Sequence, residues 1–554
     1  MITSQGEVHK ERGSVRILLI RPPFFNVEGS RGDAMDIPLG LLSIASVLER
    51  EGHAVSIFDA RVQSGDIFRR QPFMGGFLQG ASWEEIATAV RNAAPDIVGI
   101  SCPFTTQFST AVKTAELVKQ IDREIVTAVG GPHASVLPES FFMQSNSVDI
   151  AVIGEGEYAM AEIATWYRNE KPLEHIGGIV YRRDDAVIAT EKRNFIGKLD
   201  ELPLPAYHLV DMERYFTLKQ TGSPDVARPR YNYEGSERSI SFITSRGCPF
   251  NCVFCSIHLH MGQQWRAHSP EYVLRHLEYI IKHYGVRHIH FEDDNLTLRN
   301  ERFERILDGI RARKLKLTWD TPNGVRADTL NRDLLTKCKE TGCVYLIIGI
   351  ESGDQEVLDK VIRKKLSLDK VVKAIGVAHD VGLDMRAFYV IGFPGESREQ
   401  MQKTLDFALE LQRKYGVWPN VHIANPLIGT SLHKICVERA YIEGNQEGGS
   451  SPDAFARISG VIETENFTPD DVRELREKFA RRATVNHYRS FVMGLCREPG
   501  LALYILTRAL REPGRFKEFC ADTVFFRHFL IKGLTSPERS SKTAKKVSPV
   551  IADA

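Results

Sequence analysis

Short hydrophobic runs alternate with helical segments through the first third of the chain. Five runs have the length and apolar content of buried parallel strands, at residues 15–20, 53–58, 96–101, 125–129 and 149–153. Between the first two, residues 39–51 carry apolar side chains at helical spacing, and Gly52 follows as a stop signal. A second helix is expected at 107–121. Repeated strand–helix units predict an α/β fold with a doubly wound parallel sheet of the Rossmann or flavodoxin type.

The same alternation returns between residues 238 and 435. Six hydrophobic runs are each followed by polar or glycine-rich residues, at 239–244, 288–291, 316–319, 344–350, 385–391 and 421–424. One helix is marked at both ends, by Ser269 as N-cap, Pro270 at its first position and Gly285 as its stop. Polar residues at the carboxyl ends of the strands are typical of barrel enzymes, which place their sites there.

The remaining segments divide the chain further. Two short apolar runs within 178–189, separated by Arg-Arg-Asp-Asp, predict a hairpin, whereas the polar stretch 221–237 is typical of a loop. Thr468 caps a predicted C-terminal helix, and Ser, Lys and Pro dominate the last residues. We expect a first sheet domain at 1–165, a linker with a hairpin at 166–237, a barrel unit at 238–435, a helical C-terminal domain at 436–535 and a disordered tail at 536–554.

Composition places the chain among ordinary globular proteins. Its 554 residues are 43% hydrophobic and 26% charged with a formal net charge of +1, so no global field favours nucleic acid as a partner. No apolar run of about eighteen residues occurs, and the polar start does not have the pattern of a secretory signal. Nine cysteines, three of them clustered, suit the reducing cytoplasm rather than a disulfide scaffold.

Two C-terminal segments, 501–510 and 525–531, mix apolar and basic residues. A helical cap on the barrel is the simpler interpretation. The alternative is a face that contacts a membrane surface, which would suit a lipid-like substrate.

Cys248, Cys252 and Cys255 form the most informative motif, a Cys-x3-Cys-x2-Cys spacing between a predicted strand and a predicted helix. Thiolate sulfur is a soft ligand that suits iron–sulfur clusters, zinc or copper(I). A four-iron cluster usually takes four protein thiolates, so three leave one iron open to another molecule. The alternative is structural zinc with His258 or His260 as the fourth ligand, although no second Cys-x2-Cys pair follows.

With Phe254 as the aromatic residue before the third cysteine, this loop resembles the cluster loop of radical S-adenosylmethionine (SAM) enzymes. The resemblance implies a partial (β/α)6 TIM-type barrel, a [4Fe-4S] cluster, and SAM chelated to the open iron through its amino and carboxylate groups. Electron transfer then cleaves SAM to methionine and a 5′-deoxyadenosyl radical. An external one-electron reductant of the flavodoxin or ferredoxin type is therefore implied as a partner.

The resemblance assigns SAM contacts to the ends of two barrel strands. One of Asp293 and Asp294 is expected to receive the SAM amino group, and the sequence does not choose between them. Alone, such consecutive acids are more typical of a solvated loop or a helix N-terminus. Glu351 and Ser352 match a Gly-x-Glu-Ser strand end that contacts the ribose and methionine of SAM. Phe254 is expected to shield the cluster or to pack by the adenine.

Three loops after strands of the first sheet resemble the cobalamin-binding domain that many radical SAM enzymes carry. Each alone is more often a tight turn, but glycines let a large planar ligand approach the backbone. The predicted contacts are Ser101, Thr105, Gly130, Gly131, Pro132, His133, Glu155, Gly156 and Glu157. The Asp-x-His-x-x-Gly signature that supplies a histidine to cobalt elsewhere is replaced by Asp59-Ala-Arg61. We therefore expect cobalamin without a histidine below the cobalt.

These resemblances cover roughly residues 14–435 and imply a cobalamin-dependent radical SAM enzyme, similar to the class B methyltransferases. The expected reaction is C-methylation of an unactivated carbon in a small-molecule or lipid-like substrate. One SAM would methylate cobalamin, and a second would start the radical reaction that takes up the methyl group. The alternative enzyme is a radical ring-forming or oxidising one, as in the anaerobic cyclase of chlorophyll synthesis. A non-catalytic cobalamin-binding sensor or scaffold is the alternative outside enzymes, and the intact cysteine triad argues against it.

Overall fold

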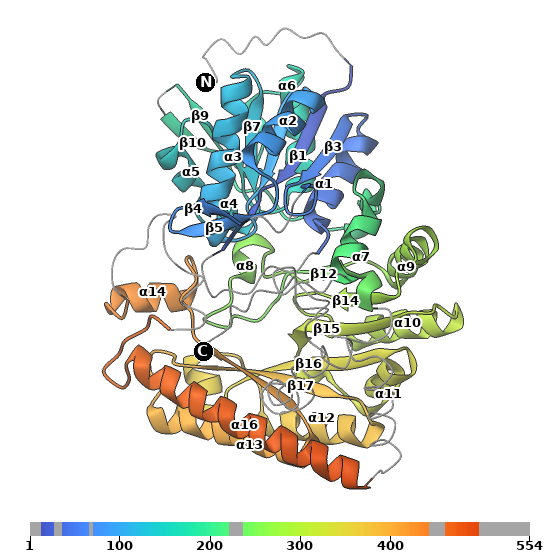
Figure 1. The fold of residues 1–554 in the computed structure, drawn as a ribbon, viewed down its shortest axis with the longest axis vertical. Coiled ribbons are helices and arrows are strands. Elements are labelled where there is room, and N and C mark those ends of the chain that lie inside the picture. The colour runs from blue at the N-terminus through green and yellow to red at the C-terminus, as the bar shows by residue number, and fades with distance from the viewer. Residues whose placement is uncertain are drawn as a thin grey trace, which may run out of the picture.

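The computed structural model describes residues 13–26, 36–65, 70–184, 186–220, 236–442 and 460–497. Two α/β units, one above the other in Figure 1, make up this part of the chain. Nearly all of the predicted loop at 221–237, both apolar and basic C-terminal segments and the predicted tail lie outside the described residues.

A seven-stranded sheet forms the core of the first unit. Its strands lie in the order β10 (Ala186–Ala189), β9 (Ile179–Arg183), β8 (Ile150–Val152), β7 (Val126–Gly130), β6 (Ile97–Ser101), β1 (Arg16–Arg21) and β3 (Ala54–Asp59). The strands from β8 to β3 are parallel, whereas β9 and β10 are antiparallel. The predicted hairpin therefore forms, and it extends the first sheet because β9 pairs with β8.

Helices cover both faces of this sheet. Ile17 and Leu19 share one hydrophobic core with α1 (Leu39–Arg50) and α6 (Gly156–Tyr167). Leu18 and Ile20, on the opposite face of β1, share another core with α2 (Trp83–Ala93) and α3 (Phe108–Ile121). This arrangement confirms the predicted doubly wound sheet. β1 lies between β3 and β6, where the strand order reverses, and such sheets bind ligands beyond the strand carboxyl ends at that point.

Several short elements of the first unit were not expected from the sequence. They are β2 (Phe24–Asn26), β5 (Gly76–Gln79) and β4 (Arg70–Phe73), which form a small antiparallel sheet, and helices α4 (Pro132–Val136) and α5 (Pro138–Gln144). Helix α7 (Met212–Gln220) then leads toward the second unit. Its Tyr215 hydroxyl donates to Asp59 at the end of β3, which joins this helix to the first sheet.

A six-stranded parallel sheet builds the second unit and confirms the predicted partial barrel. Its strands lie in the order β11 (Ser239–Phe242), β14 (His288–Phe291), β15 (Thr318–Val325), β16 (Cys343–Glu351), β17 (Met385–Ile391) and β18 (Trp418–Ile423). Its longer helices are α9 (Pro270–Tyr284), α10 (Asn300–Ala312), α11 (Arg332–Glu340), α12 (Leu368–Val381) and α13 (Arg398–Tyr415). As predicted, Ser269 caps α9 by accepting the Tyr272 N–H, and Gly285 ends it in the left-handed conformation.

The cysteine motif lies on a loop between β11 and α9. A short ladder between β12 (Ser245–Arg246) and β13 (Arg266–Ala267) closes this loop, which contains helix α8 (Ile257–His260). In Figure 1, α8 lies between the two units.

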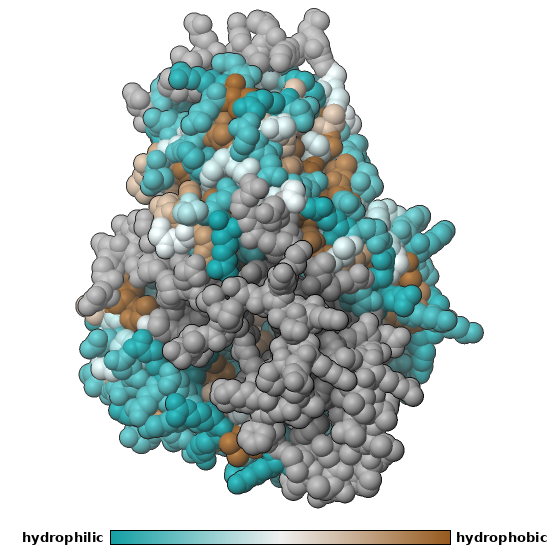
Figure 2. All heavy atoms as spheres, viewed as in Figure 1, coloured by the Kyte–Doolittle hydropathy of each residue, from teal (hydrophilic) through white to brown (hydrophobic). Residues whose placement is uncertain are grey.

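Helices α14 (Ser431–Glu438) and α16 (Pro469–Arg497) follow the barrel, and α16 runs alongside α13 (Figure 1). Thr468 caps α16 by accepting the Asp471 N–H, as predicted. The described surface in Figure 2 is mostly hydrophilic, with scattered hydrophobic patches. Within the described ranges, every helix is too short or too polar to cross a membrane.

Candidate functional site

A cavity of about 430 Å³ lies where the two units meet. The first unit contributes the carboxyl edge of its sheet, including Ser101, Gly130 and Gly131. The second unit contributes Arg246 and other residues on either side of the cysteine triad. The volume is within the range of small-molecule sites, and the position at the reversal of strand order is where doubly wound sheets bind ligands.

The cysteine loop starts at a glycine that the backbone requires. Gly247 has a φ of 82°, and a Cβ at this position would lie 2.5 Å from the carbonyl oxygen of Gln264. Cys248, Cys252 and Cys255 are all free thiols at intermediate exposure. Three partly accessible soft donors on one loop fit a cluster that must also meet SAM and a reductant.

The spacing of the cysteine sulfurs argues against zinc. Four ligands around one zinc, with Zn–S bonds near 2.3 Å, place their sulfur atoms about 3.8 Å apart. Among the residues that the structure describes, three possible metal-ligand atoms lie within 4.8 Å of one another only at His288, His290 and Asp320. The three cysteines, with or without His258 or His260, therefore do not form a site of zinc dimensions.

The two candidate aspartates after β14 have different environments. Asp293 is 1% exposed and accepts hydrogen bonds from the backbone N–H and hydroxyl of Thr244 and from the Ser245 hydroxyl. Asp294 lines the cavity and accepts the Gly247 N–H at 2.8 Å. Burial raises the pKa of Asp294 to about 7. The first carboxylate thus supports the base of the cysteine loop, and the second faces the ligand space.

Asn295 is a candidate that the sequence analysis missed. The Asn295 Nδ2 donates to the Cys248 sulfur at 3.7 Å. The Trp265 indole N–H donates to the backbone carbonyl of Asn295 at 3.0 Å. The side chain is 2% exposed, and its Oδ1 is buried without a hydrogen-bond partner among the described residues. An amide directly after three acids at a strand end was the available signal.

The end of β16 carries the other predicted SAM residues. Glu351 has a φ of 72°, unusual for a residue other than glycine, and accepts a hydrogen bond from the buried Lys364 ammonium at 2.7 Å. The Ser352 hydroxyl is fully buried, 2.9 Å from the Thr404 hydroxyl. Phe254 packs against Phe393 with ring centroids 5.8 Å apart. These three residues are not in the wall of the interunit cavity.

Most predicted cobalamin residues gather at the cavity. Its wall includes Ser101, Gly130, Gly131, Pro132, Glu155, Gly156 and Glu157. Thr105 and His133 lie outside the wall. The His133 ring is 3% exposed, 3.1 Å from the Thr105 hydroxyl and 3.3 Å from that of Ser140, and burial lowers its pKa to about 4.

Glu155 and Glu157 face arginines of the second unit. Arg246 contacts both carboxylates at 2.7 Å, and Arg266 contacts Glu155 at 2.8 Å. Burial alone would raise the pKa of Glu157, but the Arg246 guanidinium lowers it below its usual value. Neither arginine was assigned a role from the sequence.

The cavity wall has unused hydrogen-bonding capacity. His260 belongs to the wall, and its ring Nδ1 is buried without a hydrogen-bond partner among the described residues. Apolar side chains such as Leu19 and Val152 make up much of the rest. Apolar walls, glycine backbone and a free polar atom fit a large amphipathic ligand such as cobalamin.

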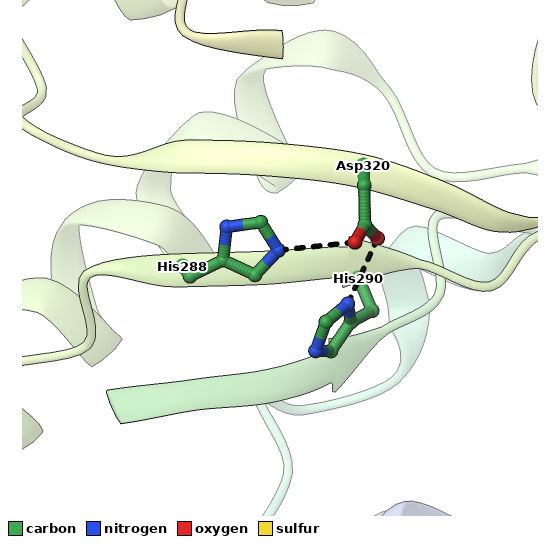
Figure 3. Close-up of side chains that lie close together, drawn as sticks. All are labelled: His288, His290 and Asp320. Carbon is green, nitrogen blue, oxygen red and sulfur yellow. Dashed lines mark hydrogen bonds and ion pairs between the residues drawn. The ribbon is translucent and has the colours of Figure 1, made fainter. Parts of the chain in front are cut away.

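A second polar cluster lies within the barrel sheet (Figure 3). Asp320 on β15 is fully buried and contacts His290 at 2.8 Å and His288 at 3.4 Å, both on β14. Tyr345 donates its hydroxyl to Asp320, and the His288 Nδ1 lies 2.8 Å from the Thr318 hydroxyl. Because each ring already has a partner, we interpret this cluster as a buried hydrogen-bond network that fixes the register of three strands.

Comparisons with known proteins agree with this geometry. A family model described as the radical SAM superfamily matches residues 242–408, and one described as the B12 binding domain matches 36–164. An uncharacterized methyltransferase of Pyrococcus horikoshii is 30% identical over 86% of this chain and 92% of its own. The cytidylyl-2-hydroxyethylphosphonate methyltransferase of Streptomyces wedmorensis is 28% identical over 82% of this chain and 87% of its own.

A solved structure shares the fold. It is the cobalamin-dependent SAM radical enzyme OxsB with aqua-cobalamin and SAM bound, which matches 94% of this chain and 72% of its own with a TM-score of 0.64 and 18% identity. The two family models follow the two α/β units along the sequence, in the order in which the structure places them. Together with the relative that is 30% identical over most of both chains, they show that the chain belongs to the cobalamin-dependent radical SAM enzymes, whose cofactors are a [4Fe-4S] cluster, SAM and cobalamin.

Proposed function

We propose that this enzyme transfers a methyl group to an unactivated carbon of a small molecule. The observation that carries the proposal is the shared cavity, because the carboxyl edge of the first sheet and both flanks of the cysteine loop open onto one space. Methyl transfer needs both cofactors near one substrate carbon, and this arrangement favours such proximity. Two relatives named as methyltransferases align with most of the chain.

We assign the cluster to Cys248, Cys252 and Cys255, with an external flavodoxin or ferredoxin as electron donor. When bound, the cluster supplies reductive cleavage of SAM, and cobalamin carries the methyl group. The protein's part is to hold three thiolates on one loop and to leave the fourth position open. The ladder between β12 and β13 supports this role by fixing both ends of the loop.

For SAM, we assign the amino group to Asp294 rather than Asp293. Asp293 already accepts three hydrogen bonds from Thr244 and Ser245, whereas Asp294 has a carboxylate at the cavity wall. Glu351 remains our candidate for the ribose, and its left-handed backbone supports a functional role. Ser352 and Phe254 are proposed to shape the same pocket from β16 and from the cysteine loop.

For cobalamin, we assign the backbone and small side chains of Ser101, Gly130, Gly131, Pro132 and Gly156, which line the cavity. Thr105 and His133 bond to each other behind this edge, and we propose that they order the turn after β7. The segment directly after β3 contains no histidine, so it offers none to cobalt. The Asp59 carboxylate has three polar partners within the protein, and Arg61 stacks on Phe24.

The chain can be divided into domains according to the cofactor that each part is proposed to hold. We propose that residues 1–165 with the hairpin of β9 and β10 hold cobalamin, that 238–435 hold the cluster and SAM, and that the rest of 166–237 joins them. The pairing of β9 with β8 supports the placement of the hairpin. Of the predicted C-terminal domain at 436–535, the described residues 460–497 are proposed to cover the barrel, as α16 does along α13.

Product analysis tests the proposed reaction. The protein is reconstituted without oxygen with iron, sulfide and cobalamin, and is then given SAM, a one-electron reductant and candidate substrates. Methylation predicts 5′-deoxyadenosine and S-adenosylhomocysteine together, and a product heavier by one CH2. Deoxyadenosine alone, with a product that has lost hydrogen or gained oxygen, would contradict methyl transfer. An absence of SAM cleavage in the reduced, fully loaded protein would contradict any radical SAM reaction.

Replacing Asn295 with alanine is expected to lower the reduction potential of the cluster. Hydrogen bonds to cluster sulfurs stabilise the more negative reduced state, and Asn295→Ala removes the N–H that reaches Cys248. The measurement is a redox titration followed by the EPR signal of the reduced cluster. Asn323→Ala is the control, because its amide donates to the Glu292 carbonyl instead of a sulfur. Equal midpoint potentials in Asn295→Ala and the wild type would contradict this role.

A further inference from the structure

A network of four charged side chains joins the two units beside the cavity. We call Glu155, Glu157, Arg246 and Arg266 the interunit clamp. The Arg246 guanidinium bridges the two carboxylates, with Nη1 2.7 Å from Glu155 and Nη2 2.7 Å from Glu157. Arg266 adds contacts of 2.8 and 2.9 Å to the two oxygens of Glu155. The acids come from the loop after β8 and the start of α6, and the arginines come from the ladder that closes the cysteine loop.

The clamp is almost entirely removed from solvent. The side chains of Glu155 and Arg266 are each 2% exposed, that of Glu157 is 6% and that of Arg246 is 14%. Buried ion pairs add little net stability, because desolvation offsets their attraction, but they strongly disfavour arrangements that leave one charge alone. A network of this kind therefore restricts how the two units can be placed relative to each other.

The clamp has further hydrogen bonds on both sides, and Ile196, in the segment between the two units, contacts both Glu155 and Arg266. Glu157 also accepts the Ser43 hydroxyl at 2.8 Å, and Glu155 accepts the Ile196 N–H. Arg266 donates to the backbone carbonyls of Ile196 and Met261. These additional hydrogen bonds leave the clamp side chains little freedom to take other positions, which makes the contact geometrically specific rather than a loose attraction.

The position of Arg246 links the clamp to the chemistry. Only Gly247 separates it from Cys248, and its partners Glu155 and Glu157 line the same cavity that we assign to cobalamin. A shift of this arginine would move the start of the cysteine loop relative to the first sheet. Misplacement of about 1 Å between reacting groups can reduce a rate by about a hundredfold.

We propose that the interunit clamp positions the cysteine loop over the cobalamin face, and that Glu155 and Glu157 act on the reaction through this placement rather than by binding cobalamin. The proposal rests on the proposed function, since it concerns the separation of that enzyme's two cofactors. Arg246 is accordingly a positioning residue. Its planar guanidinium is needed because it donates to two carboxylates at once, and not only because it carries a positive charge. Lysine keeps the charge but cannot bridge both carboxylates in the same way.

The test compares Arg246→Lys and Glu157→Gln with the wild type, all loaded with cluster and cobalamin. Reduced cluster and cob(II)alamin are both paramagnetic, so pulsed EPR measures the distribution of distances between them. The expected result is full iron, sulfide and cobalamin content in both variants, with a broader or shifted distance distribution. Glu157→Gln preserves side-chain volume and serves as the milder variant if Arg246→Lys does not fold.

Arg313→Lys is the matched control. Arg313 also contacts two carboxylates, Glu271 at 2.7 Å and Glu278 at 2.9 Å, but all three lie within the second unit. In Arg313→Lys, the distribution of distances between the reduced cluster and cob(II)alamin is expected to equal that of the wild type. An unchanged distribution in both clamp variants would overturn the proposal, as would loss of cobalamin in proportion to the lost carboxylate. Failure of the wild type itself to hold both cofactors would instead contradict the proposed function.

Discussion

Replacement of Cys248, Cys252 or Cys255 by alanine is expected to reduce SAM cleavage to background. Each change removes one of only three thiolates that the loop offers, so the cluster loses one of its protein ligands. The measurements are iron and sulfide content after anaerobic reconstitution and the release of 5′-deoxyadenosine after reduction. Both quantities should fall together in each of the three variants.

Cys436→Ala provides the matched control for this experiment. Cys436 is a buried free thiol on α14, outside the cysteine loop. Its alanine variant is expected to hold wild-type amounts of iron and to cleave SAM. Undiminished cleavage in a variant of the triad, or native protein that contains zinc alone, would contradict the cluster assignment.

Asp320→Ala is expected to produce a large loss of stability. It leaves the imidazoles of His288 and His290 and the hydroxyl of Tyr345 without their shared acceptor in a buried site. Removing one partner from a buried charged network costs roughly 3–5 kcal/mol. The measurement is the urea midpoint of the cofactor-free protein, with Asp384→Ala, at an exposed aspartate before β17, as control. Equal midpoints in the two variants would contradict this account of the barrel network.

The same network predicts a pH dependence. Burial alone would raise the pKa of Asp320, but hydrogen bonds from His288 and His290 outweigh it and hold the pKa well below its usual value. A carboxylate with a lowered pKa in the folded state adds stability above its unfolded pKa of about 3.9 and loses this contribution as the pH falls toward the folded value. The difference in unfolding midpoint between wild type and Asp320→Ala should therefore shrink below about pH 4.

The sequence predicted the framework of the fold because the two sheets are built from long buried strands. The bounds of β14 and β17 match the predicted runs, and α9 begins and ends at its expected cap and glycine. The small sheet of β2, β4 and β5 was missed because its strands are short and lack a continuous apolar pattern. The pairing of the β9 hairpin with the first sheet depends on a distant strand, which local patterns do not reveal.

The site was predictable only where one motif contained all its parts. The cysteine triad lies within eight residues and carries its own spacing signal. Asp293 and Asp294 look equivalent in sequence, and their difference appears only when Thr244 and Ser245 are seen to bond to one of them. Glu155 and Arg246 are 91 positions apart, so their contact follows from the docking of the two units. Because this contact is not visible in the sequence, Glu155 and Glu157 were assigned to cobalamin and not to an ion pair with Arg246.

The most direct test of the central claim is EPR of the reduced, reconstituted protein with and without SAM that carries 15N in its amino group. The account predicts that SAM changes the signal of the cluster and that a hyperfine coupling to 15N appears, because SAM binds the iron that the three cysteines leave open. A cluster signal that is identical with and without SAM, and that shows no 15N coupling, would contradict the account.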